Sequence, residues 1–300
     1  MSDTTSPFNI ETKSISKTVK TNSDNILSIC VLNDGRIATS TFSEVVIYNL
    51  EKDNVDMTIN ENIEEVSHLF LMQNGYLFSS ACEECIIYEI KENSYEIIQK
   101  LGGLLGDTSK SIELENGDII CLTKGFYVFK KDPALNNYNL YKTINEDKFV
   151  NDVIQVDENR IVISNSFDKQ LKFWEISTFS KVSQINDIQV GPYNNCLYKI
   201  DSKNMIVGGT NIIYLVDLST YTINKKVNNE YEIFAISPIN DKIFLTTGNE
   251  GTITQWKYDN DEITKEHEKE KLAKEECLCM KYLESGKILL GDSGNLIIIE

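Results

Sequence analysis

A repeat of about 42 residues runs through most of the chain and constrains its fold more than any other feature. In each copy, a short turn-like segment precedes an apolar run rich in β-branched residues. The runs open at residues 36, 76, 118, 160, 204, 242 and 287, within DGRIATST, NGYLFSSA, NGDIICLT, ENRIVISN, SKNMIVGG, NDKIFLTT and SGKILLGD. A period of this length indicates that one supersecondary unit is used seven times.

Every copy has the same internal order. A first apolar strand precedes the turn, as in ILSICVL (26–32), and a third strand follows the second after a polar loop. A fourth, more polar strand often closes with an aliphatic residue and asparagine, as at 59–60 and 185–186. The chain is therefore predicted to be all-β, a seven-bladed β-propeller of four-stranded antiparallel blades. Aromatic residues end six of the third strands, Phe129 among them. We interpret the other five as packing between adjacent blades: Tyr48, Tyr88, Trp174, Tyr214 and Trp256.

The seventh copy reaches Glu300 after only three strands, which leaves a sheet edge without a partner. The stretch SISKTVK (14–20) reads as a strand, and it precedes the first copy at the distance expected of a fourth strand. We predict that residues 13–20 form the outer strand of the last blade, so that an N-terminal strand closes the ring. Residues 1–12 are expected to be a disordered lead, and residues 13–300 a single seven-bladed β-propeller.

Composition narrows the choice of partners. With 41% hydrophobic and 25% charged residues the chain can bury a core, and no apolar run has the length of a membrane span. A net charge of -17 repels phosphate backbones and anionic lipids, so that nucleic acid and membrane surfaces are not expected as partners. The opening residues lack the apolar segment of a secretory signal. We expect a cytoplasmic protein, monomeric by itself, and leave the nucleus open as a compartment.

The seven cysteines form no disulfide framework, because their number is odd and their spacing irregular. Cys82 and Cys85 make a CxxC pair, but a structural zinc site needs a second pair or nearby histidines, and the chain has only His68 and His267. We interpret the pair as two incidental cysteines in a loop. No metal and no cofactor are expected.

Two segments resemble the repeat ending of the WD-repeat β-propeller family. In SFDKQLKFWEI (166–176), Asp168 and Trp174 stand where the family has them, and Glu175 replaces the usual aspartate. NEGTITQWKY (249–258) is the second-best copy. The Gly-His pair that normally opens each repeat is absent, so the family's buried Asp-His-Ser/Thr-Trp hydrogen-bond set is not carried over, and no subfamily is assigned. The resemblance implies a propeller that acts as a rigid platform for protein partners.

The inventory of reactive residues argues against an enzyme. Arg36 and Arg160 are the only arginines, and both open second strands. His68 lies in an apolar strand and His267 in a charged run, so neither has the setting of a general base. We expect no catalytic residues. The alternative that stays open is a carboxylate-lined, divalent-metal-dependent hydrolase of the lactonase-like propeller kind.

In the family, the more widely used face carries the loops that lead into each first strand and those between second and third strands. Acidic residues outnumber basic ones in these loops here. We hypothesise a non-catalytic protein-protein interaction scaffold that binds a basic peptide or protein surface on this acidic face. The alternative is an acidic coat that only solubilises the protein. The residues proposed for the face are Glu44, Glu64, Glu65, Glu84, Asp147, Asp168, Glu232, Glu250 and Asp292, with Phe42 and Tyr193 as exposed aromatic anchors.

Overall fold

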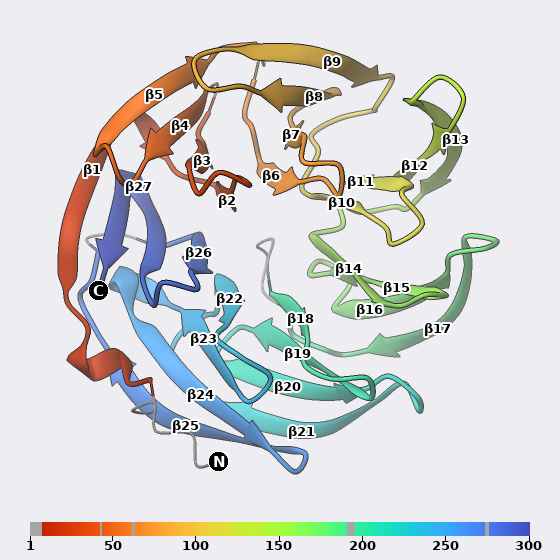
Figure 1. Cartoon of the computed structure of the whole chain (residues 1–300). Coiled ribbons are helices and arrows are strands. Elements are labelled where there is room, and N and C mark those ends of the chain that lie inside the picture. Colours follow the sequence, from red (N-terminus) through yellow and green to blue (C-terminus); the bar gives the residue numbers. More distant parts are fainter. Residues whose placement is uncertain (1–7, 43, 62–63, 191–195, 274–275) are drawn as a thin grey trace, which may run out of the picture.

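Seven antiparallel sheets stand around a central axis in the computed structural model, which confirms the predicted propeller (Figure 1). The structure describes residues 8–42, 44–61, 64–190, 196–273 and 276–300, with only the backbone described for 22–24 and 250. In six sheets the strands are paired in the order in which the chain makes them, and the first of them lies nearest the axis; the seventh sheet combines both ends of the chain. In the described ranges, no helix has the length and apolar character needed to cross a membrane.

The first three blades follow one another directly. Blade 1 contains β2 (Ser28–Val31), β3 (Ile37–Ser40), β4 (Val45–Asn49) and β5 (Asn54–Ile59). Blade 2 contains β6 (His68–Leu71), β7 (Leu77–Ser80), β8 (Glu84–Ile90) and β9 (Tyr95–Gly102). Blade 3 contains β10 (Ser111–Glu113), β11 (Ile119–Thr123), β12 (Gly125–Asp132) and β13 (Asn137–Asn145).

The next three blades repeat this pattern. Blade 4 contains β14 (Asp152–Asp157), β15 (Arg160–Asn165), β16 (Gln170–Glu175) and β17 (Ser180–Asn186). Blade 5 contains β18 (Leu197–Lys199), β19 (Asn204–Gly209), β20 (Ile212–Asp217) and β21 (Thr222–Asn228). Blade 6 contains β22 (Ala235–Pro238), β23 (Ile243–Thr247), β24 (Ile253–Asp259) and β25 (Glu262–Lys269), with the short 3-10 helix η2 (Asn249–Gly251) between β23 and β24.

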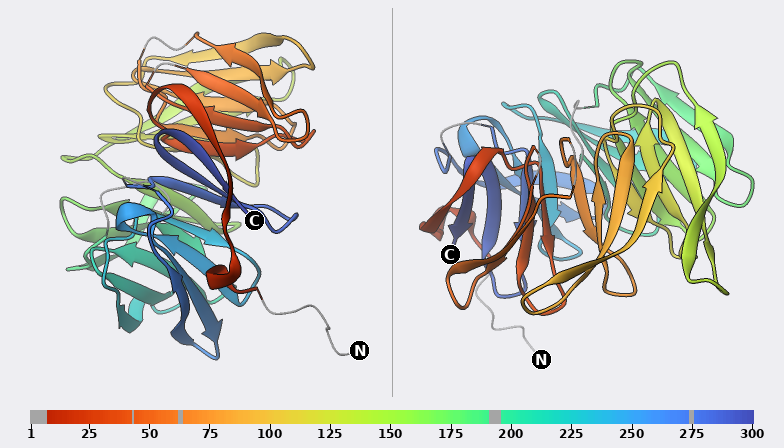
Figure 2. Two further views of the ribbon diagram at one scale, coloured as in Figure 1. Left: turned by 90° about the vertical axis from the view of Figure 1, so that its left-hand side faces the viewer. Right: turned by 90° about the horizontal axis from the view of Figure 1, so that it is seen from above.

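Blade 7 closes the ring with both ends of the chain, as predicted. It contains β26 (Cys279–Tyr282), β27 (Ile288–Ile299) and the N-terminal strand β1 (Ile15–Asn25). The first part of β27 pairs with β26, and its second part pairs with β1, from Ile15 opposite Ile299 to Asn25 opposite Ser293. Figure 2 shows β1 running along the outside of this blade beside the C-terminus. Hydrogen bonds between first and last strands therefore remove the edge that the seventh copy leaves.

The N-terminal segment before β1 is also part of the fold, in contrast to the disordered lead expected over residues 1–12. Residues 10–12 form the 3-10 helix η1 (Ile10–Thr12), and the Ile10 side chain is fully buried. Gln255 in β24 fixes this segment, because its side chain accepts from the Ile10 amide at 3.0 Å and donates to the Phe8 carbonyl at 2.9 Å. Residues 1–7 lie outside the described residues.

The turn-like segments that defined the repeat are turns between first and second strands. An aspartate or asparagine oxygen accepts a hydrogen bond from the backbone N–H two residues ahead, which fixes the turn without help from outside the blade. Gly35, which follows Asp34, has a φ of 84° that L side chains rarely adopt. This bond recurs in six blades, made by Asp34, Asn74, Asn116, Asp157, Asp201 and Asn240.

The aromatic residues of the third strands are buried between blades, as interpreted. Tyr48, Tyr88 and Trp174 each stand directly after a break in the pairing between third and fourth strands. In blade 5 the residue after this break is Val216, so that Tyr214 stands two residues earlier than its counterparts. The recurring position is therefore held by an aliphatic side chain in that blade, while Tyr214 is still 2% exposed.

Both arginines bind the next blade on the face opposite the predicted surface. Arg36 donates to the carbonyls of Lys91 and Glu92, in the turn between β8 and β9. Arg160 donates to the Leu218 carbonyl and the Tyr221 hydroxyl, in the corresponding turn of blade 5. Each guanidinium therefore joins two neighbouring blades.

Candidate interaction surface

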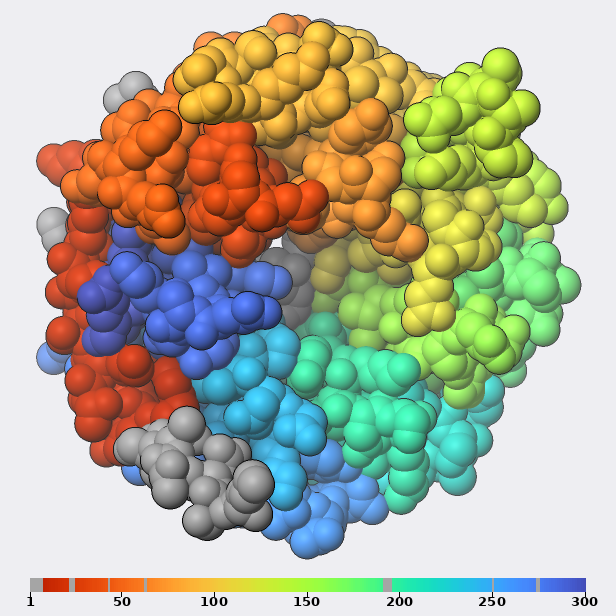
Figure 3. All heavy atoms as spheres, in the orientation of Figure 1, coloured from red at the N-terminus to blue at the C-terminus, as the bar shows by residue number. Residues whose placement is uncertain are grey.

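The loops into first strands and the loops between second and third strands lie together on one face of the ring, which we call the leading face. The alternating direction of antiparallel strands requires this arrangement. The centre of the ring is hollowed, as the space-filling view in Figure 3 shows. A cavity of about 400 Å³ lies among residues that precede the first strands of five blades, at the leading-face end of this hollow.

The wall of this central cavity combines apolar surface with two carboxylates. Leu27, Val150 and Leu278 belong to the apolar part, together with the half-buried Phe149. Glu65 and Asp107 supply the acidic groups. A long aliphatic stem that ends in a positive charge suits such a wall, because the stem covers apolar surface while the charge meets a carboxylate.

Next to the central cavity, a pocket of about 280 Å³ collects further acidic groups. It is lined by Phe42, Glu64, Cys82 and Thr108, and it shares Glu65, Ser67, Asp107 and Thr108 with the cavity. Burial, reinforced by the nearby charge of Asp107, raises the pKa of Glu65 above its usual range. Hydrogen bonding to Asp107 and then to Glu64 raises the pKa of the Cys82 thiol to about 12. We call Glu64, Glu65, Cys82 and Asp107 the acidic cluster.

No ion pair within the described residues reaches the carboxylates of the acidic cluster. The other acids predicted for the face either have partners of their own or lie apart from the acidic cluster. Glu84 pairs with Lys100 at 3.1 Å, Glu232 accepts from the Thr210 hydroxyl at 3.2 Å, and Asp168 accepts from the Asn165 amide at 3.2 Å. Glu44 is half-buried and Asp147 is exposed, and neither lines the pocket of the acidic cluster. Among the proposed acids whose side chains the structure describes, only Glu64 and Glu65 therefore meet in one site.

Asp292 differs from the exposed position that we expected. Its side chain is buried, with 4% of the residue exposed, and it accepts from the Ser293 amide at 2.6 Å. The backbone carbonyl of Asp292 accepts from the amide of Ile26, directly after β1. A partner on the leading face cannot reach this carboxylate without local opening.

Of the two aromatic anchors, Phe42 has the position expected of one. It is 56% exposed and lines the pocket of the acidic cluster. Two other large apolar residues on leading-face loops, Leu105 and Phe167, are also exposed. Tyr193 lies outside the described residues, and so does the side chain of Glu250. Both therefore stay predictions.

Deeper in the channel wall, charged groups are paired with each other. Lys110 and Asp152 are both buried and lie 2.5 Å apart, and the other oxygen of Asp152 accepts from the Leu197 amide at 2.8 Å. Burial, with a smaller contribution from the charge of Lys110, lowers the pKa of His68 well below its usual range. The buried Asp152 carboxylate thus joins blades 3, 4 and 5.

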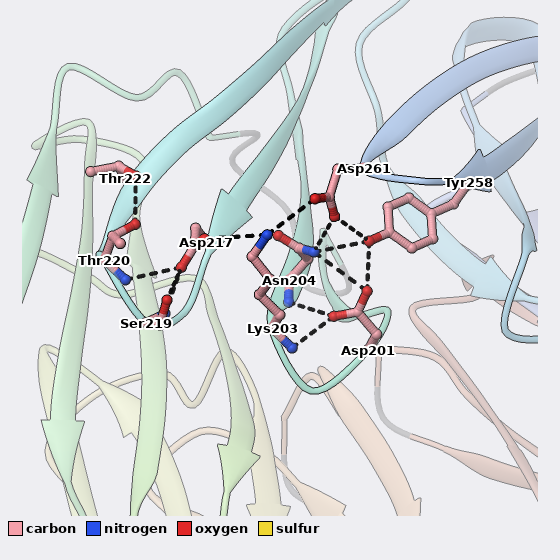
Figure 4. A network of polar contacts seen from close by, with 9 residues as sticks. All are labelled: Asp201, Lys203, Asn204, Asp217, Ser219, Thr220, Thr222, Tyr258 and Asp261. Atoms are coloured by element: carbon pink, nitrogen blue, oxygen red, sulfur yellow. Dashed lines mark hydrogen bonds and ion pairs between the residues drawn. The ribbon is translucent and has the colours of Figure 1, made fainter.

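On the opposite face, a polar network joins blades 5 and 6 (Figure 4). Asn204 is fully buried, and its amide donates to Tyr258 at 2.9 Å and to Asp261 at 2.8 Å. Tyr258 donates to Asp201 at 2.6 Å, and Lys203 lies 3.0 Å from Asp261. We call these five residues the blade 5–6 network. It connects the first turn of blade 5 to the turn between β24 and β25.

Donors keep the carboxylates of the blade 5–6 network ionised. Burial alone raises the pKa of Asp201, but hydrogen bonds from Tyr258 and from the Lys203 and Asn204 amides outweigh it, so that the pKa is lowered. Hydrogen bonds from Lys203 and Tyr258 lower the pKa of Asp261. In the adjacent turn, hydrogen bonds from Ser219 and Thr220 lower the pKa of Asp217. These acids stabilise the fold.

Sequence reasoning missed two members of the acidic cluster. Asp107 stands in an irregular loop between β9 and β10, where no repeated pattern singles out one acid from its neighbours. Cys82 was noted only with Cys85, but the Cys85 thiol points into the core, where it lies 3.8 Å from the sulfur of Cys121. The two cysteines of the CxxC pair thus lie in different environments: Cys82 lines a surface pocket, and Cys85 is buried in the core.

Comparisons with known proteins agree with this architecture at the level of the fold. No family model and no curated protein matches the sequence. A chain in the crystal structure of the mitotic checkpoint complex superposes with a TM-score of 0.79 at 12% identity, covering 95% of this chain and 93% of that one. The crystal structure of the RRP9 WD40 repeats gives a TM-score of 0.78 at 13% identity, covering 97% and 98%. The chain therefore has the fold of a seven-bladed WD-repeat propeller, without an assigned subfamily.

Proposed function

We propose that this protein is a non-catalytic interaction scaffold whose leading face binds a basic segment of a protein partner. The observation that carries the proposal is the central cavity, where apolar walls and two carboxylates, Glu65 and Asp107, stand together. The raised pKa of Glu65 means that its charge is poorly compensated in the free protein. A lysine or arginine of the partner supplies the missing charge, and its stem covers Leu27 and Val150.

The exposed aromatic ring of Phe42 extends this site outward. It lies on the rim of the pocket that adjoins the cavity, where it can pack against a residue flanking the basic side chain. Large exposed aromatic residues near the centre of a contact surface often contribute most of its affinity. The rigid sheets hold all of these loops in place, which lowers the ordering cost of binding. The solved propellers that share this fold support the proposal of a protein platform by analogy only.

Fluorescence anisotropy with a labelled peptide of lysine, arginine and leucine residues tests the proposal. We expect binding that weakens steadily as the NaCl concentration rises. The double variant Glu65→Gln/Asp107→Asn should bind at least about 10-fold more weakly, a loss of about 1.4 kcal/mol. The matched control is Glu115→Gln/Glu158→Gln, which removes two exposed charges from turns on the opposite face.

The control separates a site from a general acidic coat. If the wild-type protein binds no basic peptide, or if both double variants lose affinity equally, the proposed site is wrong. An equal loss would assign the acidic residues to solubility instead. A salt-independent interaction would also contradict the proposal, because the contact is argued from charge.

A further inference from the structure

Three of the acidic cluster's residues bring metal-ligand atoms together from three separate loops. Glu64 precedes β6, Cys82 lies between β7 and β8, and Asp107 precedes β10. One carboxylate oxygen of each acid and the Cys82 sulfur all lie within 4.8 Å of one another. Around a four-coordinate zinc ion with bonds of about 2.0 to 2.3 Å, donor atoms stand about 3.5 Å apart. Small side-chain rotations therefore suffice to close this triangle on one ion.

A second observation at the same place points to a ligand. Thr108, next to Asp107, is 2% exposed and forms part of the wall of the pocket. Among the described residues its hydroxyl has no hydrogen-bond partner. Buried polar groups are rarely left without a partner, so the unpaired hydroxyl of a residue that lines this pocket points to a polar ligand close by. Water bound to a metal ion in this pocket is such a ligand, because it donates to the hydroxyl oxygen.

The chemistry of the donors selects the class of ion. A thiolate is a soft ligand that Mg²⁺ and Ca²⁺ do not favour, whereas Zn²⁺ accepts sulfur and carboxylate oxygen in one tetrahedral site. Cys82 is the one cysteine of the chain that is not buried, so it is the thiol that an ion from solution reaches. The net charge of the three ligands also draws a divalent cation, because no lysine or arginine among the described residues forms an ion pair with these two acids.

We propose that Glu64, Cys82 and Asp107 bind one Zn²⁺ ion, with the fourth coordination position open to the pocket. As the sulfur–zinc bond forms, the thiol proton passes to solvent, and no bond of the protein breaks. The bound ion ties together three loops that span blades 1, 2 and 3. This site shares Asp107 with the proposed peptide site, but it is tested by itself, because metal binding is measured on the protein without any partner.

Titration with Co²⁺, the spectroscopic substitute for Zn²⁺, tests the site directly. We expect a thiolate-to-cobalt charge-transfer band that saturates at one equivalent and disappears when Zn²⁺ is added. Cys82→Ser should abolish the band, and Asp107→Asn should weaken Zn²⁺ binding, measured by calorimetry, at least about 10-fold. Glu84→Gln is the matched control, because Glu84 lies two residues from Cys82 but pairs with Lys100.

Thermal melting supplies a second readout that does not depend on absorbance. Zn²⁺ in excess should raise the melting temperature of the wild-type protein and of Glu84→Gln, because the ion binds only the folded state. It should leave Cys82→Ser unchanged, and melting without metal checks that each variant folds. A wild-type protein without the charge-transfer band, a band that survives Cys82→Ser, or equal Zn²⁺ affinity in Asp107→Asn would each overturn the proposal.

Discussion

The acidic cluster and the blade 5–6 network both contain carboxylates, yet the pKa shifts resolved in the two regions have opposite directions. In the network, Tyr258, Asn204 and Lys203 surround Asp201 and Asp261 with donors, and the pKa values of both acids are lowered. In the cluster, Glu65 is exposed on the leading face, and desolvation together with the nearby charge of Asp107 raises its pKa. A carboxylate with donors holds blades together, whereas a carboxylate without them is held ready for a cationic ligand.

The difference follows from where the two regions lie. The network occupies tight turns whose backbone geometry is the same in most blades, so its donors can be fixed by the fold. The cluster occupies loops of irregular length on the leading face, where positions can vary without disturbing the sheets. Structural and binding roles of acids are thus divided between the two faces of one ring, and variants in each region should separate stability from binding.

The largest expected effect is on stability, at the centre of the blade 5–6 network. Asn204→Ala removes a fully buried amide that donates to Tyr258 and Asp261. We expect a loss of about 1 to 3 kcal/mol in the free energy of unfolding, since buried polar groups lose their partners. Each kcal/mol corresponds to a drop of about 2 to 4 °C in melting temperature for a protein of roughly this size.

The control for Asn204→Ala stands in the corresponding turn of the next blade. Lys242 directly precedes the second strand β23, but it is exposed and makes no side-chain bond to another blade within the described residues. Lys242→Ala should therefore leave the melting temperature unchanged. Equal losses in the two variants would mean that the position matters for its turn and not for the network. Peptide affinity should be the same in both.

The second effect is on binding: here the peptide affinity should fall while the melting temperature stays the same. Phe42→Ala removes an exposed ring from the rim of the acidic cluster's pocket. We expect an affinity for the basic peptide about 5- to 10-fold lower, or about 1 kcal/mol, with no change in melting temperature. Tyr258→Phe, which takes one hydroxyl from the network, should lower the melting temperature and leave the affinity alone. Loss of stability in Phe42→Ala would instead assign the ring to the core.

The third effect concerns acid stability. The Asp217 carboxylate accepts from the Ser219 amide at 2.8 Å and the Thr220 amide at 2.9 Å, and its pKa is lowered. Its stabilising contribution is therefore complete above the ordinary range of aspartate, and it is lost as the pH falls through the lowered folded-state pKa. Asp217→Asn should lower the neutral-pH melting temperature slightly and flatten its decline below about pH 4. Asp241→Asn, in an exposed turn, should decline as the wild type does.

The sequence predicted the parts of this molecule that repeat. The turns at Asp34 and Asn74 and the closing strand near Ile15 follow from patterning and turn chemistry, which act within one blade or between neighbouring strands. Asp107 and Cys82 could not be joined by any such pattern, because their proximity depends on how two irregular loops fold over the ring. Asp292 shows the same limit, since its loop position predicted exposure, whereas the residue is buried and bonded to Ile26, far away in the sequence.

The smallest effect tests the opposite sign of the pKa shift in the acidic cluster. Because burial and Asp107 raise the folded-state pKa of Glu65, the folded protein holds this proton more tightly than the unfolded chain does. The contribution of Glu65 to stability is therefore present below its unfolded-state pKa and is lost as the pH rises through the raised value. Glu65→Gln keeps a neutral side chain at every pH, so its melting temperature should match the wild type near pH 4 and exceed it slightly at pH 7. The exposed position of Glu65 keeps this gain small, because solvent screens the charge. A loss of stability at pH 7 in Glu65→Gln would mean that donors do surround this carboxylate, and the contrast with Asp201 would fail.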